Sequence, residues 1–367
     1  MSEEIDPSSQ LRTLTQALSH RDSKIGFLLG AGCACSVLDA AGGPLIPAID
    51  ALSVTICDAL RKTPLAVALK LLEDQYAEDG EPCPNVEKLL SRVRTLREIA
   101  GKSKPRGLGA KDLDALDEAI CRGVEKVVDQ DLPVGDSSYG SFARWVREIE
   151  RHHPVEIFTT NYDLLLEEAL ERVHAPFFDG FIGAHKPFFD VSAMDLDRLP
   201  ERWTRLWKVH GSINWRLTAG GGIVRSRDGA SIPLIFPSHL KYAESRRLPY
   251  LAMRDRLRNF VKDRGMLITC GYSFGDDHLN EDITSGLAAN AGSVCYALMF
   301  LPIADCQVVR AIALSRPNLI IIARDGGVIR GRDVVWPSGT TLNIGDFRGF
   351  GSFVVDEVVG KANVAGV

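Results

Sequence analysis

Short apolar runs recur along this chain and favour a sheet of parallel strands. Each run has the length of a strand and is bounded by turn residues, and helical patterns separate several of the runs. The runs cover residues 25–29, 155–159, 206–209, 267–270, 294–300 and 319–323. Strands that alternate with helices predict an α/β fold, with a doubly wound, mostly parallel Rossmann-like sheet that has helices on both faces.

The segment between the first and second runs contains no convincing strand. Apolar residues there repeat with helical period over residues 51–61, 65–76, 86–99 and 113–128. Asn85 precedes the third of these segments and is typical of a helix N-cap. We expect a domain of residues 1–330 with a helical insertion at about residues 50–150. Residues 331–367 form a Gly-rich C-terminal tail, and edge strands and an assembly surface both remain open for it.

Charge and composition exclude several classes of protein. The net charge is −5 and the basic residues are scattered, so no direct contact with nucleic acid is expected. The acidic start and the lack of a long apolar run predict a cytoplasmic protein without a membrane span. The eight cysteines include no C-x-x-C pair, so we expect free thiols packed as small hydrophobic groups and no bound metal.

Two strand ends carry residues suited to a nucleotide. Gly30, Ala31 and Gly32 follow the first run, where backbone N–H groups can approach a pyrophosphate at a helix N-terminus. A plain strand-to-helix turn explains the same residues equally well. Asn161 and Asp163 follow the second run, where an amide and a carboxylate can contact ribose hydroxyls. Helix capping explains one of these polar residues but not the whole cluster around them.

Two further strand ends add groups for proton transfer and for binding. His210 stands beside a glycine after the third run, where an imidazole with an ordinary pKa of about 6.5 can exchange a proton near neutral pH. A core histidine with a satisfied hydrogen bond is the simpler interpretation. Gly271, Ser273 and Asp276 follow the fourth run and offer close backbone approach, a hydroxyl and a carboxylate. An Asp-rich turn with an N-cap remains the alternative.

Together, the motifs Gly-Ala-Gly, Thr-Thr-Asn-Tyr-Asp, Val-His-Gly-Ser and Gly-Tyr-Ser-Phe-Gly-Asp resemble the sirtuin-like superfamily. More narrowly, they resemble the bacterial SIR2-domain proteins that hydrolyse NAD+ in antiphage defence. The resemblance spans roughly residues 25–325. It implies a Rossmann-like NAD-binding domain, with NAD+ as the substrate and nicotinamide and ADP-ribose as the products.

The resemblance also implies roles for individual residues. Those implied for NAD+ binding are Gly30, Ala31, Gly32, Thr160, Asp163, Gly271, Ser273 and Asp276. Asn161 would hold water or substrate near the anomeric carbon of the nicotinamide ribose, and His210 would act as the base. Proteins of this type tend to form homo-oligomers or to work with a separate ATPase or another defence component, so such partners are expected here.

Two other functions fit the same motifs. A non-catalytic NAD or ADP-ribose sensor would bind the nucleotide and signal to a partner without breaking a bond. A protein deacylase or ADP-ribosyl transferase fits less well, because deacylating sirtuins carry a four-cysteine zinc module after the catalytic histidine. This chain has no cysteine between Cys121 and Cys270.

Overall fold

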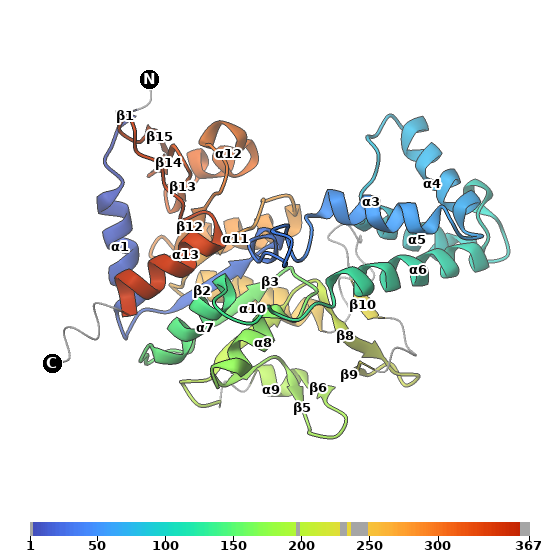
Figure 1. Ribbon diagram of the computed structural model, residues 1–367, viewed down its shortest axis with the longest axis horizontal. Helices are drawn as coiled ribbons and strands as arrows, with labels where there is room; N and C mark the ends of the chain where they lie inside the picture. The colour runs from blue at the N-terminus through green and yellow to red at the C-terminus, as the bar shows by residue number, and fades with distance from the viewer. Residues whose placement is uncertain (1–2, 196–198, 228–232, 236–248, 360–367) are drawn as a thin grey trace.

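A ten-stranded, mostly parallel sheet organises the residues that the computed structural model describes, which are 3–195, 199–227, 233–235 and 249–359 (Figure 1). In spatial order its strands are β1 (Glu3–Glu4), β15 (Arg332–Val335), β14 (Gly326–Ile329), β13 (Leu319–Ile322), β12 (Val294–Leu298), β11 (Met266–Cys270), β2 (Ile25–Leu29), β3 (Glu156–Thr159), β7 (Thr204–Lys208) and β4 (Phe177–Phe178). Neighbouring strands from β13 to β4 are all parallel.

The strand order reverses next to β2, the first of the long strands. Chain order runs from β2 through β3 to β7 on one side, and then from β11 through β12 to β13 on the other. This is the 3-2-1-4-5-6 order of dinucleotide-binding folds, in which ligands bind beside the first strand at the carboxyl ends. The predicted doubly wound α/β fold is therefore confirmed. The six predicted strands are β2, β3, β7, β11, β12 and β13, with boundaries that differ by two residues at most.

Helices cover both faces of the sheet because side chains alternate along each strand. In β2, Phe27 and Leu29 join one buried apolar cluster, while Leu28 joins the other. The first cluster is covered by α1 (Ser8–Ser19), α7 (Ser138–Glu148), α8 (Leu165–Arg172), α13 (Phe347–Phe353) and the π-helical η3 (Val354–Val359). The second is covered by α10 (Tyr250–Lys262), α11 (Asp277–Ala289) and α12 (Gln307–Ser315).

Four helices between β2 and β3 form an arm that projects from the body of the molecule (Figure 1). They are α3 (Ile49–Leu60), α4 (Ala66–Glu78), α5 (Val86–Ala100) and α6 (Ala110–Val128), with the short 3₁₀ turn η1 (Pro105–Gly107) between the last two. These helices match the four segments predicted from apolar period. The side chain of Asn85 accepts a hydrogen bond from the amide of Lys88, so the predicted N-cap is also confirmed.

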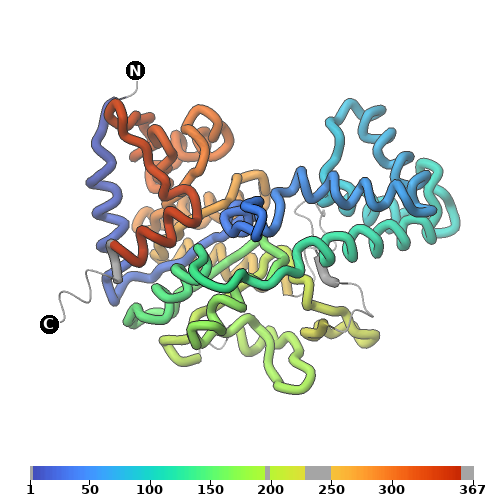
Figure 2. Tube along the Cα trace, in the orientation of Figure 1, coloured from blue at the N-terminus to red at the C-terminus, as the bar shows by residue number. Residues whose placement is uncertain are grey.

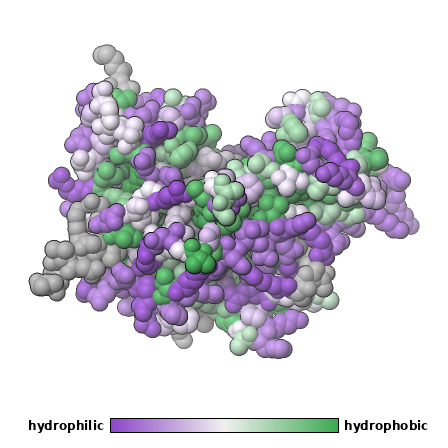
Figure 3. Space-filling model, in the orientation of Figure 1, coloured by the Kyte–Doolittle hydropathy of each residue, from purple (hydrophilic) through white to green (hydrophobic). Residues whose placement is uncertain are grey.

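The arm helices bury some apolar side chains and expose others. In α6, the buried residues Leu113, Leu116 and Ile120 recur at helical spacing and face the other arm helices. Val54 and Val67 are exposed on α3 and α4, at 60% and 72%, and Ile99 on α5 is exposed at 66%. Figure 3 shows apolar side chains mixed with polar ones on the viewed face of the arm.

A second, smaller sheet lies beyond the end of β7. Its order is β10 (Pro233–Ile235), β8 (Gly211–Leu217), β9 (Ile223–Arg225), β6 (Phe188–Phe189) and β5 (Phe181–Ile182). β8 and β9 are antiparallel and are joined by a Gly-rich turn at residues 218–222. The remaining short elements are α2 (Ala31–Cys35), α9 (Val191–Asp195) and η2 (Ile303–Asp305).

The C-terminal segment packs back onto the main body. β15 pairs with β14 and β1, and α13 packs against α7 while η3 packs against α1 (Figure 2). Phe347 and Phe350 of α13 are buried at 1% and 0% exposure. Residues 331–359 of the expected tail thus include β15, which lies between β1 and β14, and the covering helix α13, while residues 360–367 lie outside the described residues.

Candidate functional site

The four strand-end motifs lie along one edge of the sheet. The sheet register pairs Leu29 with Cys270 on one side and with Thr159 on the other, and pairs Thr159 with Lys208. Asn161 and His210 each stand two residues beyond this last pair. Val209 donates its amide to the carbonyl of Thr159 at 2.9 Å, so the two chains are still side by side there. Adjacent strands are about 4.8 Å apart, which makes Asn161 and His210 neighbours at the carboxyl edge.

The strand order reverses beside β2, and we call this place the switch point. The glycines there allow two backbones to touch. The amide of Gly30 donates to the carbonyl of Cys270 and that of Gly32 to the carbonyl of Gly271, both at 3.0 Å. A Cβ on Gly30 would lie 2.4 Å from the carbonyl oxygen of Gly271, and one on Gly32 would lie 2.8 Å from its Cα. Close packing against β11 is therefore one physical reason for these glycines. Ala31 and Gly32 are exposed beside this contact and Gly30 is buried.

Asn161 is held from both its backbone and its side chain. Its amide N–H donates to the hydroxyl of Thr159 at 3.0 Å, and its Nδ2 donates to the hydroxyl of Tyr139 at 3.4 Å. Asn161 is 8% exposed. Its neighbour Thr160 is half-buried and donates its amide to Leu29 at 3.1 Å. The side chain is thus fixed at the strand end.

Asp163 lies behind Asn161 among buried charges. Its Oδ1 accepts from the amide of Leu165 at 3.1 Å, and its carbonyl accepts from the ammonium of Lys208. Lys208 also donates to Glu167 at 2.9 Å. Burial raises the pKa of Asp163 to about 6, while the positive charge of Lys208 opposes this shift. The N-cap position of α8 is Leu164, so Asp163 stands one residue before the cap, although it accepts the amide of the first helical residue, and its carboxylate packs inside the protein.

His210 contacts Asp276, which comes from the other side of the switch point. Nε2 of His210 is 2.9 Å from Oδ2 of Asp276, and the two residues are 9% and 7% exposed. The other oxygen of Asp276 caps α11 by accepting from the amides of His278 and Leu279, at 2.9 and 3.2 Å. Burial alone would raise the pKa of Asp276, but the hydrogen bond and charge of His210 and these amides hold it below its ordinary value.

The loop after β11 completes the row of predicted residues. Gly271 has φ +63°, and a Cβ there would lie 2.4 Å from the amide nitrogen of Cys33, so only glycine fits without strain. Ser273 is exposed on the same loop. The structure therefore brings Asn161, His210 and Asp276 to the edge where Gly30, Ala31, Gly32 and Gly271 meet, whereas Asp163 lies behind it.

Two residues at the site were missed by sequence reasoning. Tyr139 lies on α7 and reaches Asn161 with its hydroxyl, and its surroundings of buried apolar side chains raise its pKa well above the ordinary value. Lys208 ends a buried strand with its ammonium 2% exposed. A lysine inside an apolar strand run is a signal of a buried partner, but nothing near Tyr139 in the sequence points to Asn161.

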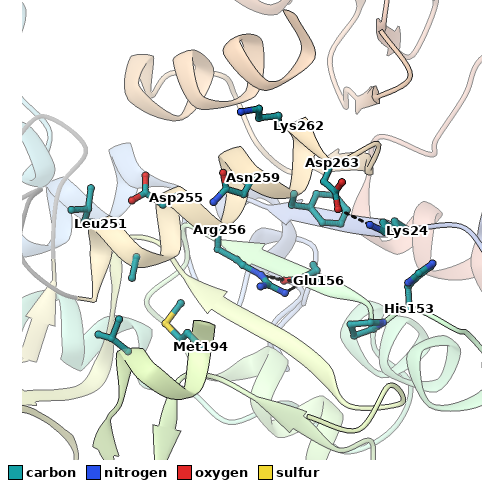
Figure 4. A pocket seen from close by; sticks show the side chains of 14 residues that line it. Lys24, His153, Glu156, Met194, Leu251, Asp255, Arg256, Asn259, Lys262 and Asp263 are labelled. Carbon is teal, nitrogen blue, oxygen red and sulfur yellow. Dashed lines mark hydrogen bonds and ion pairs between the residues drawn. The ribbon is translucent and has the colours of Figure 1, made fainter. Parts of the chain in front are cut away.

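A groove of about 1090 Å³ lies at the opposite, amino edge of the sheet (Figure 4). Arg256 of α10 forms an ion pair there with Glu156, which also accepts from the indole of Trp207 at 2.5 Å. Lys24 pairs with Asp263 at 2.6 Å. The groove shares no residue with the strand-end motifs. Parallel sheets bind ligands at their carboxyl ends, so we assign the candidate site to the carboxyl edge.

A comparison with protein families gives one match. Residues 155–316 match the model of a SIR2-like domain. The match covers less than half of the chain. It includes Asn161, Asp163, His210 and the loop from Gly271 to Asp276. The glycine turn after β2 and the helical arm lie before it.

Comparisons with whole proteins are less specific. No curated protein matches the chain. Among solved structures, one from work on the mechanism and regulation of Sir2 enzymes covers 97% of this chain and 99% of its own, at 12% identity and a TM-score of 0.43. A mutant Sir2 homologue in complex with ADP-ribose covers 78% and 83%, at 13% identity and a TM-score of 0.37. The strand order of the large sheet by itself defines the fold.

The predicted free cysteines are confirmed, and Cys270 and Cys295 are buried in their strands as expected. The part of the chain that the structure describes contains no group of three or more His, Cys, Asp or Glu side chains placed to bind a metal ion. None of the described helices combines the length and the apolar character needed to cross a membrane.

Proposed function

We propose that this chain hydrolyses NAD+ at the bond between nicotinamide and ribose, releasing nicotinamide and ADP-ribose. The observation that carries the proposal is the position of Asn161 and His210, each two residues beyond the last paired residues of the adjacent strands β3 and β7, beside the switch point. An amide and an imidazole at that place can act on the same sugar, while Gly30, Ala31, Gly32, Thr160, Gly271 and Ser273 lie along the edge where the rest of the dinucleotide would bind.

Cleavage of the glycosidic bond requires the protein to orient the substrate and to supply one proton acceptor. Breaking the glycosidic bond passes through an oxocarbenium-like state, which positioned polar groups stabilise. Asn161 is suited to hold a water or a ribose hydroxyl near the anomeric carbon, because its side chain is fixed by Tyr139. His210 is suited to accept the proton, because its ring is fixed by Asp276.

Nicotinamide release by the purified full chain tests the proposal, with any partner that copurifies retained. Asn161→Ala and His210→Ala should each lower turnover of NAD+ by at least about 100-fold, the usual worth of a positioned acid–base or orienting group. Asn259→Ala and His153→Ala are matched controls, because they remove the same residue types from the groove at the opposite edge. Wild-type turnover in either strand-end variant would contradict the mechanism.

The same assay separates the enzyme from a sensor and from a transferase. A sensor would bind NAD+ or ADP-ribose and return the dinucleotide unchanged after long incubation. A deacylase or an ADP-ribosyl transferase would leave an O-acyl product or a labelled protein in place of free ADP-ribose. Free nicotinamide and ADP-ribose in equal amounts are the result that we expect.

We further propose that the chain depletes cytoplasmic NAD+ during antiphage defence, as the proteins whose motifs it resembles do. Homo-oligomers, or a complex with a separate ATPase or another defence component, would control the activity. Cells that express the chain should lose NAD+ after phage infection, and cells with His210→Ala should not.

A further inference from the structure

The loop after β11 reaches across two strands to contact His210. β7 and β11 are separated in the sheet by β3 and β2. At about 4.8 Å per strand, their carboxyl ends lie about 14 Å apart. The contact of 2.9 Å between Nε2 of His210 and Oδ2 of Asp276 therefore depends on the path of the loop over the strand ends.

Hydrogen bonds inside the loop fix that path. Tyr272 donates its hydroxyl to Oδ1 of Asn280 at 3.0 Å, and Nδ2 of Asn280 donates to the carbonyl of Phe274 at 2.8 Å. Phe274 is 1% exposed and has φ +57°, a strained value for a residue with a side chain. Such a conformation persists only where the surroundings hold it, so the position of Asp276 is well defined.

Asp276 is a carboxylate, and each of its two oxygens has its own hydrogen-bond partner. Oδ1 accepts the amides of His278 and Leu279 at the N-terminus of α11, where a negative charge is favoured. Oδ2 is left for His210. An ionised carboxylate only accepts hydrogen bonds, so Nε2 of His210 must carry a proton, and a neutral imidazole then has its lone pair on Nδ1.

We propose that Asp276 is a positioning residue, which orients His210 and keeps its proton on Nε2 so that Nδ1 is the atom that accepts a proton during the reaction. This rests on the proposed function. In the balanced step, the glycosidic C–N bond breaks and its electron pair stays with neutral nicotinamide. The oxygen of water bonds to the anomeric carbon of the ribose. One proton of that water passes to Nδ1 and then to solvent, so NAD+ and water give nicotinamide, ADP-ribose and a proton.

The resemblance to sirtuin-like proteins implies a different role for Asp276, namely contact with NAD+. The two roles predict different kinetics. A residue that acts through His210 changes kcat and leaves KM nearly constant, whereas a residue that binds substrate equally in ground and transition states changes KM.

The test variant is Asp276→Asn, because asparagine caps a helix about as well as aspartate and so keeps α11 in place. With its oxygen on the α11 amides, the new amide NH₂ faces Nε2 and donates to it, which moves the ring proton to Nδ1. We expect kcat to fall by about 10²- to 10⁴-fold, the range for a lost general base, with KM within about threefold of the wild type. Asp277→Asn, which changes an exposed carboxylate one residue away, is the matched control.

A second readout does not depend on activity. In full-length protein with ¹⁵N-labelled histidine, the signals absent from His210→Ala identify this ring. The wild type should show the Nε2–H form and Asp276→Asn the Nδ1–H form. A wild type that has the Nε2–H form but releases no nicotinamide would contradict the proposed function and would still agree with the tautomer assignment. An Nδ1–H form in the wild type, unchanged kcat in Asp276→Asn, or a raised KM with normal kcat would overturn the role proposed for Asp276.

Discussion

Two buried aspartates at the strand ends have opposite electrostatic surroundings. Burial is the main influence on the pKa of Asp163 and raises it to about 6. Burial also acts on Asp276, but His210 and the amides of α11 outweigh it and lower the pKa. A raised pKa means that the folded state binds the proton more tightly than the unfolded chain, and a lowered pKa means the reverse. Asp276 therefore stabilises the fold above the unfolded pKa, and this contribution is lost as the pH falls through the lowered value.

The charge on Asp163 should make the protein less stable as the pH rises. The protonated carboxyl of Asp163 contributes fully to the free energy of unfolding below about pH 4. This contribution is lost between about pH 4 and pH 6, because the buried carboxyl must then ionise. Asp163→Asn removes the free-energy cost of ionising a buried carboxyl. Relative to the wild type, the free energy of unfolding of the variant should increase by roughly 1–3 kcal/mol between pH 4.5 and pH 7.5.

Urea denaturation at several pH values measures this difference. Asp277→Asn, which removes an exposed carboxylate, is the control for a general effect of charge. A constant difference between Asp163→Asn and the wild type over this pH range would show that Lys208 neutralises the buried carboxylate fully.

At the scale of elements, the turn after β2 and the loop after β11 form one unit. Gly30, Gly32 and Gly271 bring the two backbones into contact, and the amides of the turn bond to the carbonyls of the loop. A change at Gly271 should therefore disturb both motifs together, even though more than two hundred residues separate them in the sequence.

Gly271→Ala should destabilise the protein by at least about 2 kcal/mol, since alanine is strained at φ +63° and its Cβ would meet the amide of Cys33. Gly220→Ala is the control, because that glycine has open space around its Cβ position and no positive φ. Its effect should stay within about 1 kcal/mol. Thermal unfolding compares the two variants, and equal stability would contradict the close packing described here.

The sequence predicted the strands that matter for the site, because their apolar runs are long and end abruptly. Its apolar runs placed Asn161, His210 and Gly271 at strand ends. Only the family resemblance implied that Asn161 and His210 act on one ribose, since the order of parallel strands depends on long-range packing. Tyr139 and the contact of Asp276 with His210 were not predictable, because no local pattern joins residues that distant. Two-residue strands such as β4 (Phe177–Phe178) are too short to leave a period in the sequence.

At the scale of the whole molecule, the helical arm contacts the segment that carries Asn161. The hydroxyl of Tyr162, the next residue, donates to Glu87 of α5 at 2.9 Å. Arg216 of β8 donates to Glu125 of α6 at 2.5 Å. The C-terminal helix α13 contacts the site from the opposite side, where Phe347 packs against Tyr139 with ring centroids 5.0 Å apart. The arm and the C-terminal helix therefore both support the residues at the carboxyl edge.

The central claim is that the carboxyl edge of the sheet, and not the groove at the amino edge, binds the dinucleotide. A crystal structure of His210→Ala with NAD+ tests this most directly, because the variant should bind the substrate without consuming it. We expect the nicotinamide ribose within hydrogen-bond distance of Asn161, with the pyrophosphate beside Ala31 and Gly32. NAD+ bound between Glu156, Arg256 and Asn259, with the carboxyl edge empty, would contradict the account.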